Sequence, residues 1–175
     1  MTSRNYRINT ENRKGANGPI SAGILRPGLH ESPPPSEIPR VTRLFLILGA
    51  LSAAISVAAG AFGAHALRAR VEPRLLEVFE TAARYQMYHA FALIAVALVL
   101  ARTNGITTAL LGPAPGNSLA VASGWCFVVG TMLFSGSLYA MTFTGIRALG
   151  AITPLGGVAF IAGWVCLAVA AIRMR

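Results

Sequence analysis

The ten residues from Glu80 to His89 bring an acid, a base, an amide, two phenols and an imidazole into one stretch, Glu-Thr-Ala-Ala-Arg-Tyr-Gln-Met-Tyr-His. Such side chains can donate and accept hydrogen bonds, bind anions, carry protons or ligate metals. Glu80 and Arg84 stand four residues apart, in the order that favours an ion pair along one helix. The stretch is therefore the first candidate for a polar network or a ligand site.

This stretch lies at the entrance of an apolar run that ends near Ala101. Counted from Met87, the run is too short to cross a hydrocarbon layer of about 30 Å, which needs about 20 helical residues. A membrane span must therefore begin near Ala82, and it draws the polar residues to membrane depth. Pro73 suits the first turn of a helix. We expect a helix over 73–101 whose amphipathic beginning continues into a membrane span.

Three other segments are long and apolar enough to span a bilayer as helices, and they cover residues 44–67, 119–143 and 154–172. Of the whole sequence, 54% is hydrophobic and 12% is charged, a composition typical of membrane proteins. The predicted fold is an all-α membrane protein with four transmembrane helices in an up-down bundle.

The polar first forty residues differ from the rest of the chain. Residues 1–40 are rich in Asn, Gly and Pro and have too little apolar area to offset the entropy of ordering, so we expect a disordered tail. Residues 41–175 then form the transmembrane domain. The cysteines, Cys126 and Cys166, fall inside apolar runs, where they act as small apolar residues and form no metal-binding motif.

The charge pattern indicates a lipid bilayer as the partner. The net charge is +9, but many of the arginines flank apolar runs, where they anchor helices to phospholipid headgroups, so we expect no nucleic-acid binding. An inner-membrane, multi-pass location follows. With four spans both termini lie on one side, and the basic tail favours the cytoplasm.

The same topology gathers the polar residues near one membrane face, because the ends of the first and third helices meet the starts of the second and fourth. A shared network facing the interior is expected, since polar groups in lipid are costly without partners. The candidate network or ligand residues are His65, Glu80, Arg84, Tyr85, Gln86, Tyr88, His89, Ser135, Ser137, Tyr139, Arg147 and Thr153. No catalytic or metal site is assigned.

Small residues predict close helix packing. The pairs Ala59/Gly63 and Gly60/Ala64 fit the small-xxx-small pattern that lets two helix backbones approach. The pattern suits either contact within the bundle, which we favour, or association into a homo-oligomer or a larger membrane complex. The packing candidates are Ala59, Gly60, Gly63, Ala64, Gly136, Gly156 and Gly157.

Four motifs together resemble a known family. They are Gly-Ala-Phe-Gly-Ala-His from residue 60, the stretch at 80–89, Phe-Ser-Gly-Ser-Leu-Tyr from residue 134, and Gly-Ala-Ile-Thr-Pro-Leu-Gly-Gly from residue 150. They resemble the small bacterial inner-membrane family catalogued as domain of unknown function 423, which is similar to a small eukaryotic transmembrane protein. The resemblance runs from about Leu44 to Ile172 and implies a multi-span membrane protein with no established reaction. The forty-residue tail departs from the family pattern.

Three functions fit these residues. The first is a structural or accessory bundle in which the polar residues form a buried network that fixes helix register. The second is a binder or transporter of a small ligand or lipid headgroup, with Arg84 pairing an anion and the histidines His65 and His89 carrying protons. The third is a haem or metal site at the same two histidines. No Ser-His-Asp pattern, phosphate loop or paired acids within the membrane indicate an enzyme, and we expect no cofactor.

Overall fold

The computed structural model describes residues 38–103 and 117–174. These residues belong to one compact unit, Pro35–Arg175. The tail that we expect to be disordered lies outside the described residues, apart from its last three positions.

The described chain consists of long helices joined by short helical turns. Along the chain the elements are α1 (Arg40–Phe62), the π-helical turn η1 (Gly63–Leu67), α2 (Pro73–Thr103), α4 (Asn117–Thr144), the 3-10 turn η2 (Arg147–Ala151) and α5 (Thr153–Arg173). Four stretches are long and apolar enough to cross a membrane, namely Arg40–Leu67, Pro73–Arg102, Asn117–Thr144 and Arg147–Arg173. The all-α fold with four membrane-spanning helices is thereby confirmed.

Prolines and one glycine set several helix boundaries. Proline stands directly before α1, is the first residue of α2, and occupies the first turn of α5, where its missing N–H costs nothing. After α4, Gly145 adopts a positive φ of 71°, which lets the chain turn back. α1 begins four residues before the expected 44 and ends at Phe62, from where η1 continues to 67. The other helices extend beyond the expected 73–101, 119–143 and 154–172 by up to two residues at an end.

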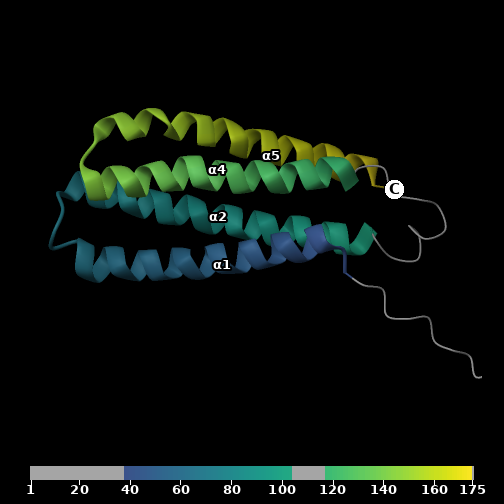
Figure 1. Cartoon of the computed structure of the whole chain (residues 1–175), viewed down its shortest axis with the longest axis horizontal. Coiled ribbons are helices and arrows are strands. Elements are labelled where there is room, and N and C mark those ends of the chain that lie inside the picture. Colours follow the sequence, from purple (N-terminus) through teal and green to yellow (C-terminus); the bar gives the residue numbers. More distant parts are fainter. Residues whose placement is uncertain (1–37, 104–116, 175) are drawn as a thin grey trace, which may run out of the picture. The chain divides into compact units, whose positions relative to one another are not determined.

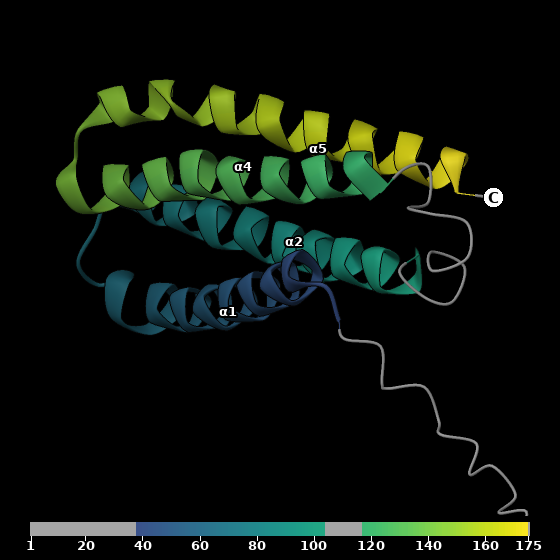
Figure 2. The ribbon, with the colours of Figure 1, turned by 45° about the vertical axis from the view of Figure 1, so that its right-hand side comes forward.

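The four helices lie side by side in a row, in the order α1, α2, α4, α5, as Figures 1 and 2 show from two directions. Most contacts join α1 to α2, α2 to α4, and α4 to α5. Within the apolar window of each span, 50% of residues are buried in α2 and 33% in α4, against 17% in the α1 span and 22% in the α5 span. The inner helices α2 and α4 therefore carry the core, and the outer two present broad faces to lipid.

Phenylalanine rings against glycines set the register of α4 on α5. A Cβ atom at Gly163 would lie 2.6 Å from Phe127 Cε1, and one at Gly130 would lie 2.5 Å from Phe160 Cδ1. At a third level Gly156 lies directly against the backbone of Phe134. From one contact to the next, the residue number rises along α4 by as much as it falls along α5, as expected for an antiparallel pair. Only glycine admits this approach.

Similar contacts hold α1. Gly49 lies against the backbone of Ala90 on α2, Gly63 against the ring of Phe79 on α2, and the ring of Phe45 fits over Gly124 on α4. Of the small residues expected to pack, Gly63 and Gly156 therefore do so. Three others do not, because no atom lies within 4 Å of a Cβ at Gly60, Gly136 or Gly157.

The end of the unit that carries η1 and η2 is called the η end below; it lies on the left in Figure 1. An aromatic cluster closes the core there. Phe79 is 3% exposed, and its ring centre lies 4.9 Å from that of Tyr139, 5.8 Å from that of Phe143 and 6.1 Å from that of Phe62. These rings come from three helices, so the cluster joins α1, α2 and α4 at the η end.

Candidate functional site

Gln86 is the centre of the polar cluster that the structure forms. Its Nε2 donates to the backbone oxygen of Ser52 on α1 over 3.1 Å, and its Oε1 accepts from the hydroxyl of Tyr139 on α4 over 2.9 Å. Only 6% of its surface is exposed. One amide thus joins three helices and satisfies both of its polar ends, as a buried amide in lipid requires.

Two serines attach the neighbouring helices to the backbone of α2. Ser56 on α1 donates to the oxygen of Ala83 over 2.6 Å, and Ser135 on α4 donates to the oxygen of Ala82 over 2.9 Å. The acceptors are adjacent residues, so α2 is held from both sides at one level. A hydroxyl that finds an acceptor across helices contributes about 0.6 kcal/mol within a membrane.

A third connection joins α4 to the start of α5. The hydroxyls of Ser137 and Thr153 lie 2.9 Å apart, and Ser137 also donates to the backbone oxygen of Phe134 over 3.0 Å. Because the Ser137 hydroxyl uses its one proton towards a single acceptor at a time, Thr153 is the donor whenever Ser137 bonds Phe134. Together these bonds bring Gln86, Ser135, Ser137, Tyr139 and Thr153 into interhelical contacts.

The charged members of the expected network are not part of it. Glu80, Arg84 and Arg147 are exposed, and no ion pair joins Glu80 to Arg84 within the described chain. Glu80 and Arg84 lie on the outward face of α2. The buried side of α2 runs through Phe79, Ala82, Ala83 and Gln86, and a position one residue further along is turned by about 100° towards the outside.

The side chains of Tyr85 and Tyr88 also lie outside the hydrogen-bonded cluster. The backbone oxygen of Tyr85 accepts a hydrogen bond from His89. The side chains are 39% and 53% exposed, and their rings meet edge to face at 5.9 Å. Tyr85 also stacks on Phe134 of α4 at 4.7 Å. Both tyrosines therefore contribute aromatic surface.

His65 and His89, the expected pair of metal or haem ligands, are not brought together. His65 is exposed on η1, whereas His89 is 5% exposed and stacks on Phe160 of α5. Since Gly63 faces Phe79, His89 lies about ten residues, or about 15 Å, further along α2. Among the described residues, no group of three or more His, Cys, Asp or Glu side chains could hold a metal ion.

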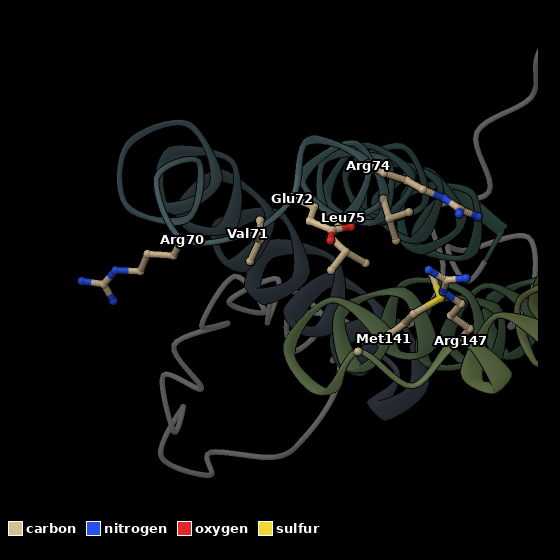
Figure 3. A pocket seen from close by; sticks show the side chains of 9 residues that line it. Arg70, Val71, Glu72, Arg74, Leu75, Met141 and Arg147 are labelled. Carbon is tan, nitrogen blue, oxygen red and sulfur yellow. The ribbon is translucent and has the colours of Figure 1, made fainter.

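Cavities follow the outer side of α4 near the η end. One of about 540 Å³ is lined by two arginines and an apolar wall, and its main residues are Arg74, Phe134, Leu138, Met141, Arg147 and Thr153. Two neighbours of about 390 and 410 Å³ share Arg74 with it. Figure 3 shows the first of these neighbours, with Arg74 and Arg147 extending on one side and Arg70 pointing away on the other. We call the three cavities the arginine groove.

The arginine groove is positively charged where it is widest. No acid lines the 540 Å³ cavity; Glu72 and Glu77 line the two smaller ones. Within the part of the chain that the structure describes, neither Arg74 nor Arg147 forms an ion pair or a hydrogen bond. Both guanidinium groups are therefore available to an anion, and bidentate pairing with phosphate is their preferred chemistry.

Sequence reasoning missed Arg74 and the two serines of α1. Arg74 is one of several arginines near membrane ends, and only the meeting of α2, α4 and η2 distinguishes it. Ser52 and Ser56 did carry a signal, because they stand four residues apart in an otherwise apolar helix and so share a face. This face of α1 packs against α2.

Comparison with known proteins places the chain in a family. Residues 59–157 match DUF423, described as a protein of unknown function. The UPF0382 membrane protein YwdK of Bacillus subtilis is 43% identical over 131 residues, which cover 75% of this chain and 98% of that protein. A UPF0382 membrane protein of Staphylococcus haemolyticus is 42% identical over 131 residues, with 75% and 97% covered. No solved structure matches the chain.

The resemblance drawn from the four sequence motifs is confirmed by these matches. The relatives are named as membrane proteins, in agreement with the four apolar helices of this chain. By its sequence, this chain belongs to the DUF423 family of membrane proteins.

Proposed function

We propose that this protein is a non-enzymatic accessory protein of the cell membrane that binds the headgroup of an anionic phospholipid in the arginine groove. The observation that carries the proposal is the 540 Å³ cavity lined by Arg74 and Arg147 and by no acid. The polar cluster around Gln86 then serves to hold the helices that form the groove.

The depth of the two arginines fits a phospholipid. Arg74 is the second residue of α2, and Arg147 is the first residue of η2, so both lie at ends of membrane-spanning stretches. Headgroup phosphates occupy this level of a bilayer. A soluble anion would need only the two positive charges, whereas the groove also has an apolar surface next to them.

An apolar wall continues from the arginines along α4. Phe134, Leu138 and Met141 line the same cavity and lie at successively shallower levels towards the η end. A lipid bound by its phosphate would lay an acyl chain along this wall. Thr153 also lines this cavity, and its hydroxyl is held by that of Ser137 at 2.9 Å.

The test is retention of anionic lipid by the full chain in nanodiscs that contain phosphatidylglycerol and phosphatidylcholine, measured by native mass spectrometry. The double variant R74Q/R147Q should lose about 2 kcal/mol of binding free energy, or about thirtyfold in affinity, at about 1 kcal/mol per basic residue. The matched control R68Q/R84Q removes the same charge from two exposed arginines that line none of the three cavities. It should retain most of the binding.

Three results would contradict the proposal. One is equal retention of the two lipids by the natural sequence, and another is an equal loss in both double variants, which would indicate general surface charge. The third is displacement of the lipid by inorganic phosphate at millimolar concentration, which would identify a site for a free anion.

We also propose that both termini lie in the cytoplasm, on the basis of the basic tail. A single cysteine in place of Arg70, in a variant without Cys126 and Cys166, should react with a membrane-impermeant maleimide added to intact cells. The same reagent should leave a cysteine at Arg173 unlabelled. The reverse pattern would place the termini outside.

Association through α1 is a further proposal for the assembly of the protein. Gly60 and Ala64 face outward, with no neighbour of their own chain at Gly60, so a second membrane helix can approach there. The variant G60I should dissociate the oligomer in a cross-linking assay while its thermal stability stays unchanged. An oligomer unaffected by G60I would show that this face is not the contact.

A further inference from the structure

A second cavity lies deeper in the membrane than the arginine groove and differs from it in chemistry. It has a volume of about 580 Å³, lies between α2 and α5 over α4, and is lined mainly by rings, from Tyr85, Tyr88, His89, Phe134, Phe160 and Trp164. Its volume is within the range of about 300–1,000 Å³ common to small-molecule sites. Its described lining residues include no arginine, lysine or carboxylate. We call it the histidine cavity.

The hydrogen bond of His89 fixes which ring nitrogen carries the proton. Nδ1 lies 2.8 Å from the backbone oxygen of Tyr85, and because a carbonyl oxygen can only accept, Nδ1 is the donor. In the neutral imidazole Nε2 then carries a lone pair and is an acceptor. The imidazole is neutral here because no acid faces it within the cavity and an isolated charge at this depth is costly.

Nε2 of His89 has no partner, yet it is not sealed from its surroundings. Within the described residues no hydrogen bond reaches it. The fully buried side-chain atoms without a partner are Thr42 Oγ1, Ser52 Oγ, Ser123 Oγ and Thr131 Oγ1, and Nε2 of His89 is not one of them. His89 therefore offers one accessible acceptor to a donor that enters the cavity.

Aromatic rings pack around the imidazole of His89. Phe160 lies parallel to the imidazole at 6°, with the ring centres 3.3 Å apart, and covers one face. Phe127 and Trp164 lie 5.6 and 6.2 Å away. Nε2 lies at the edge of the imidazole, where a ligand can form a directed hydrogen bond without displacing Phe160 from the ring face. The exposed rings of Tyr88 and Trp164 provide flat apolar surface beside it.

Depth limits the ligand to molecules that dissolve in the bilayer. His89 lies about 24 Å along α2 from Pro73 and about 20 Å from Arg102, at about 1.5 Å per residue. His89 therefore lies near the middle of the span, far from both membrane surfaces. A water-soluble ligand would have to leave its hydration shell to reach the cavity.

We propose that the histidine cavity binds a lipid-soluble hydroquinone, whose ring packs against the aromatic walls and whose hydroxyl donates a hydrogen bond to Nε2 of His89. A fatty acid is disfavoured because the described lining residues include no arginine or lysine to pair with its carboxylate. The oxidised quinone is disfavoured because its carbonyl oxygens only accept, and Nε2 has no proton to give. The hydrogen bond to Nε2 is therefore available to the reduced ring and not to the oxidised one.

This inference is independent of the lipid site, because the two sites share only Phe134 as a lining residue. The probe is a short-chain ubiquinol analogue, added under anaerobic conditions to the full chain in nanodiscs of neutral lipid. The measurement is the thermal unfolding midpoint, which a ligand of the folded state raises. The reduced probe should act at a concentration about tenfold lower than its oxidised form, the difference expected for one hydrogen bond in an apolar site.

Two variants separate the hydrogen bond from the cavity. H89F keeps an aromatic ring against Phe160 and removes the acceptor, so the reduced probe should lose its tenfold advantage. The control Y88F removes a hydroxyl from the same cavity and should keep that advantage. The variant R74Q/R147Q should also keep it, whatever the outcome of the lipid experiment.

A blocking variant tests the cavity if H89F does not fold. Gly157 lines the cavity and has no atom within 4 Å of an added Cβ, so G157L should fill the space without disturbing the helices. It should fold and respond to neither probe. The inference fails if the natural sequence responds equally to both oxidation states or to neither, if Y88F loses the preference as H89F does, or if G157L still responds.

Discussion

The hydroxyl of Tyr139 donates a 2.9 Å hydrogen bond to Oε1 of Gln86, and the nitrogen of the same amide donates to α1. The two bonds fix the orientation of the amide, because exchanging its oxygen and nitrogen would place one acceptor against another at the backbone oxygen of Ser52. They also make the position of α1 depend on a residue of α4. At its centre, the polar stretch that the sequence indicated as a candidate ligand site therefore connects three helices.

Removing the Tyr139 hydroxyl should destabilise the fold modestly. Y139F leaves Gln86 Oε1 without its donor, and we expect a loss of about 0.6 to 1.7 kcal/mol in the free energy of unfolding, the range measured for such bonds in membranes. Q86L should cost more because it breaks both bonds. A double-mutant cycle in lipid or detergent measures the coupling. Y88F, whose side chain is 53% exposed, is the control and should have no effect.

Two adjacent glycines should respond oppositely to alanine. G156A places a Cβ 2.5 Å from the backbone nitrogen of Phe134, where no rotamer change can relieve the clash, so a loss of about 1–3 kcal/mol is expected. G157A meets nothing within 4 Å and should be neutral or stabilise by up to about 1 kcal/mol through helix propensity. Equal effects in thermal unfolding would contradict the packing of α5 on α4.

Two phenylalanines of α2 offer a matched comparison of buried and lipid-facing rings. Phe79 is 3% exposed within the aromatic cluster, whereas Phe91 is 59% exposed. F79A should cost about 3 kcal/mol, because the cavity it leaves loses ring contacts to three residues. F91A should cost less than about 1 kcal/mol, since lipid chains replace the missing contacts. Chemical unfolding in mixed micelles compares the two.

Salt should distinguish the lipid site from the histidine cavity. Raising the ionic strength from about 0.1 to 1 M shortens the screening length from about 10 to 3 Å, so retention of phosphatidylglycerol at Arg74 and Arg147 should weaken. Binding of the neutral hydroquinone at His89 involves no charge and should stay constant. Parallel titrations at the two salt concentrations measure both, and a salt-dependent hydroquinone response would contradict the proposed hydrogen bond.

The sequence was sufficient to predict the number of membrane spans, because four apolar runs of the right length leave little choice. It also predicted that α2 begins with an amphipathic part at Pro73, since the purely apolar run was too short to span. Among the polar residues named from the sequence, Gln86, Ser135 and Tyr139 form interhelical hydrogen bonds, and an uncompensated amide or hydroxyl at that depth is costly.

The sequence could not decide which face of α2 is buried. Glu80 and Arg84 formed a plausible pair by spacing, yet the burial of Phe79 and Gln86 turns both charges outward. The choice depends on contacts with residues far apart in the chain, such as Gly63 against the Phe79 ring and the hydrogen bonds from Ser56 and Ser135 to the α2 backbone. The same holds for Arg74, whose cavity exists only where α2, α4 and η2 meet.

The row of helices has a consequence for how the protein is assembled. Each main contact joins helices that follow one another along the chain, so a helix entering the bilayer during synthesis meets its principal partner already in place. No helix has to be inserted between two that have already paired. The helices can therefore insert and pack one after another, from α1 to α5, while the chain is being translated.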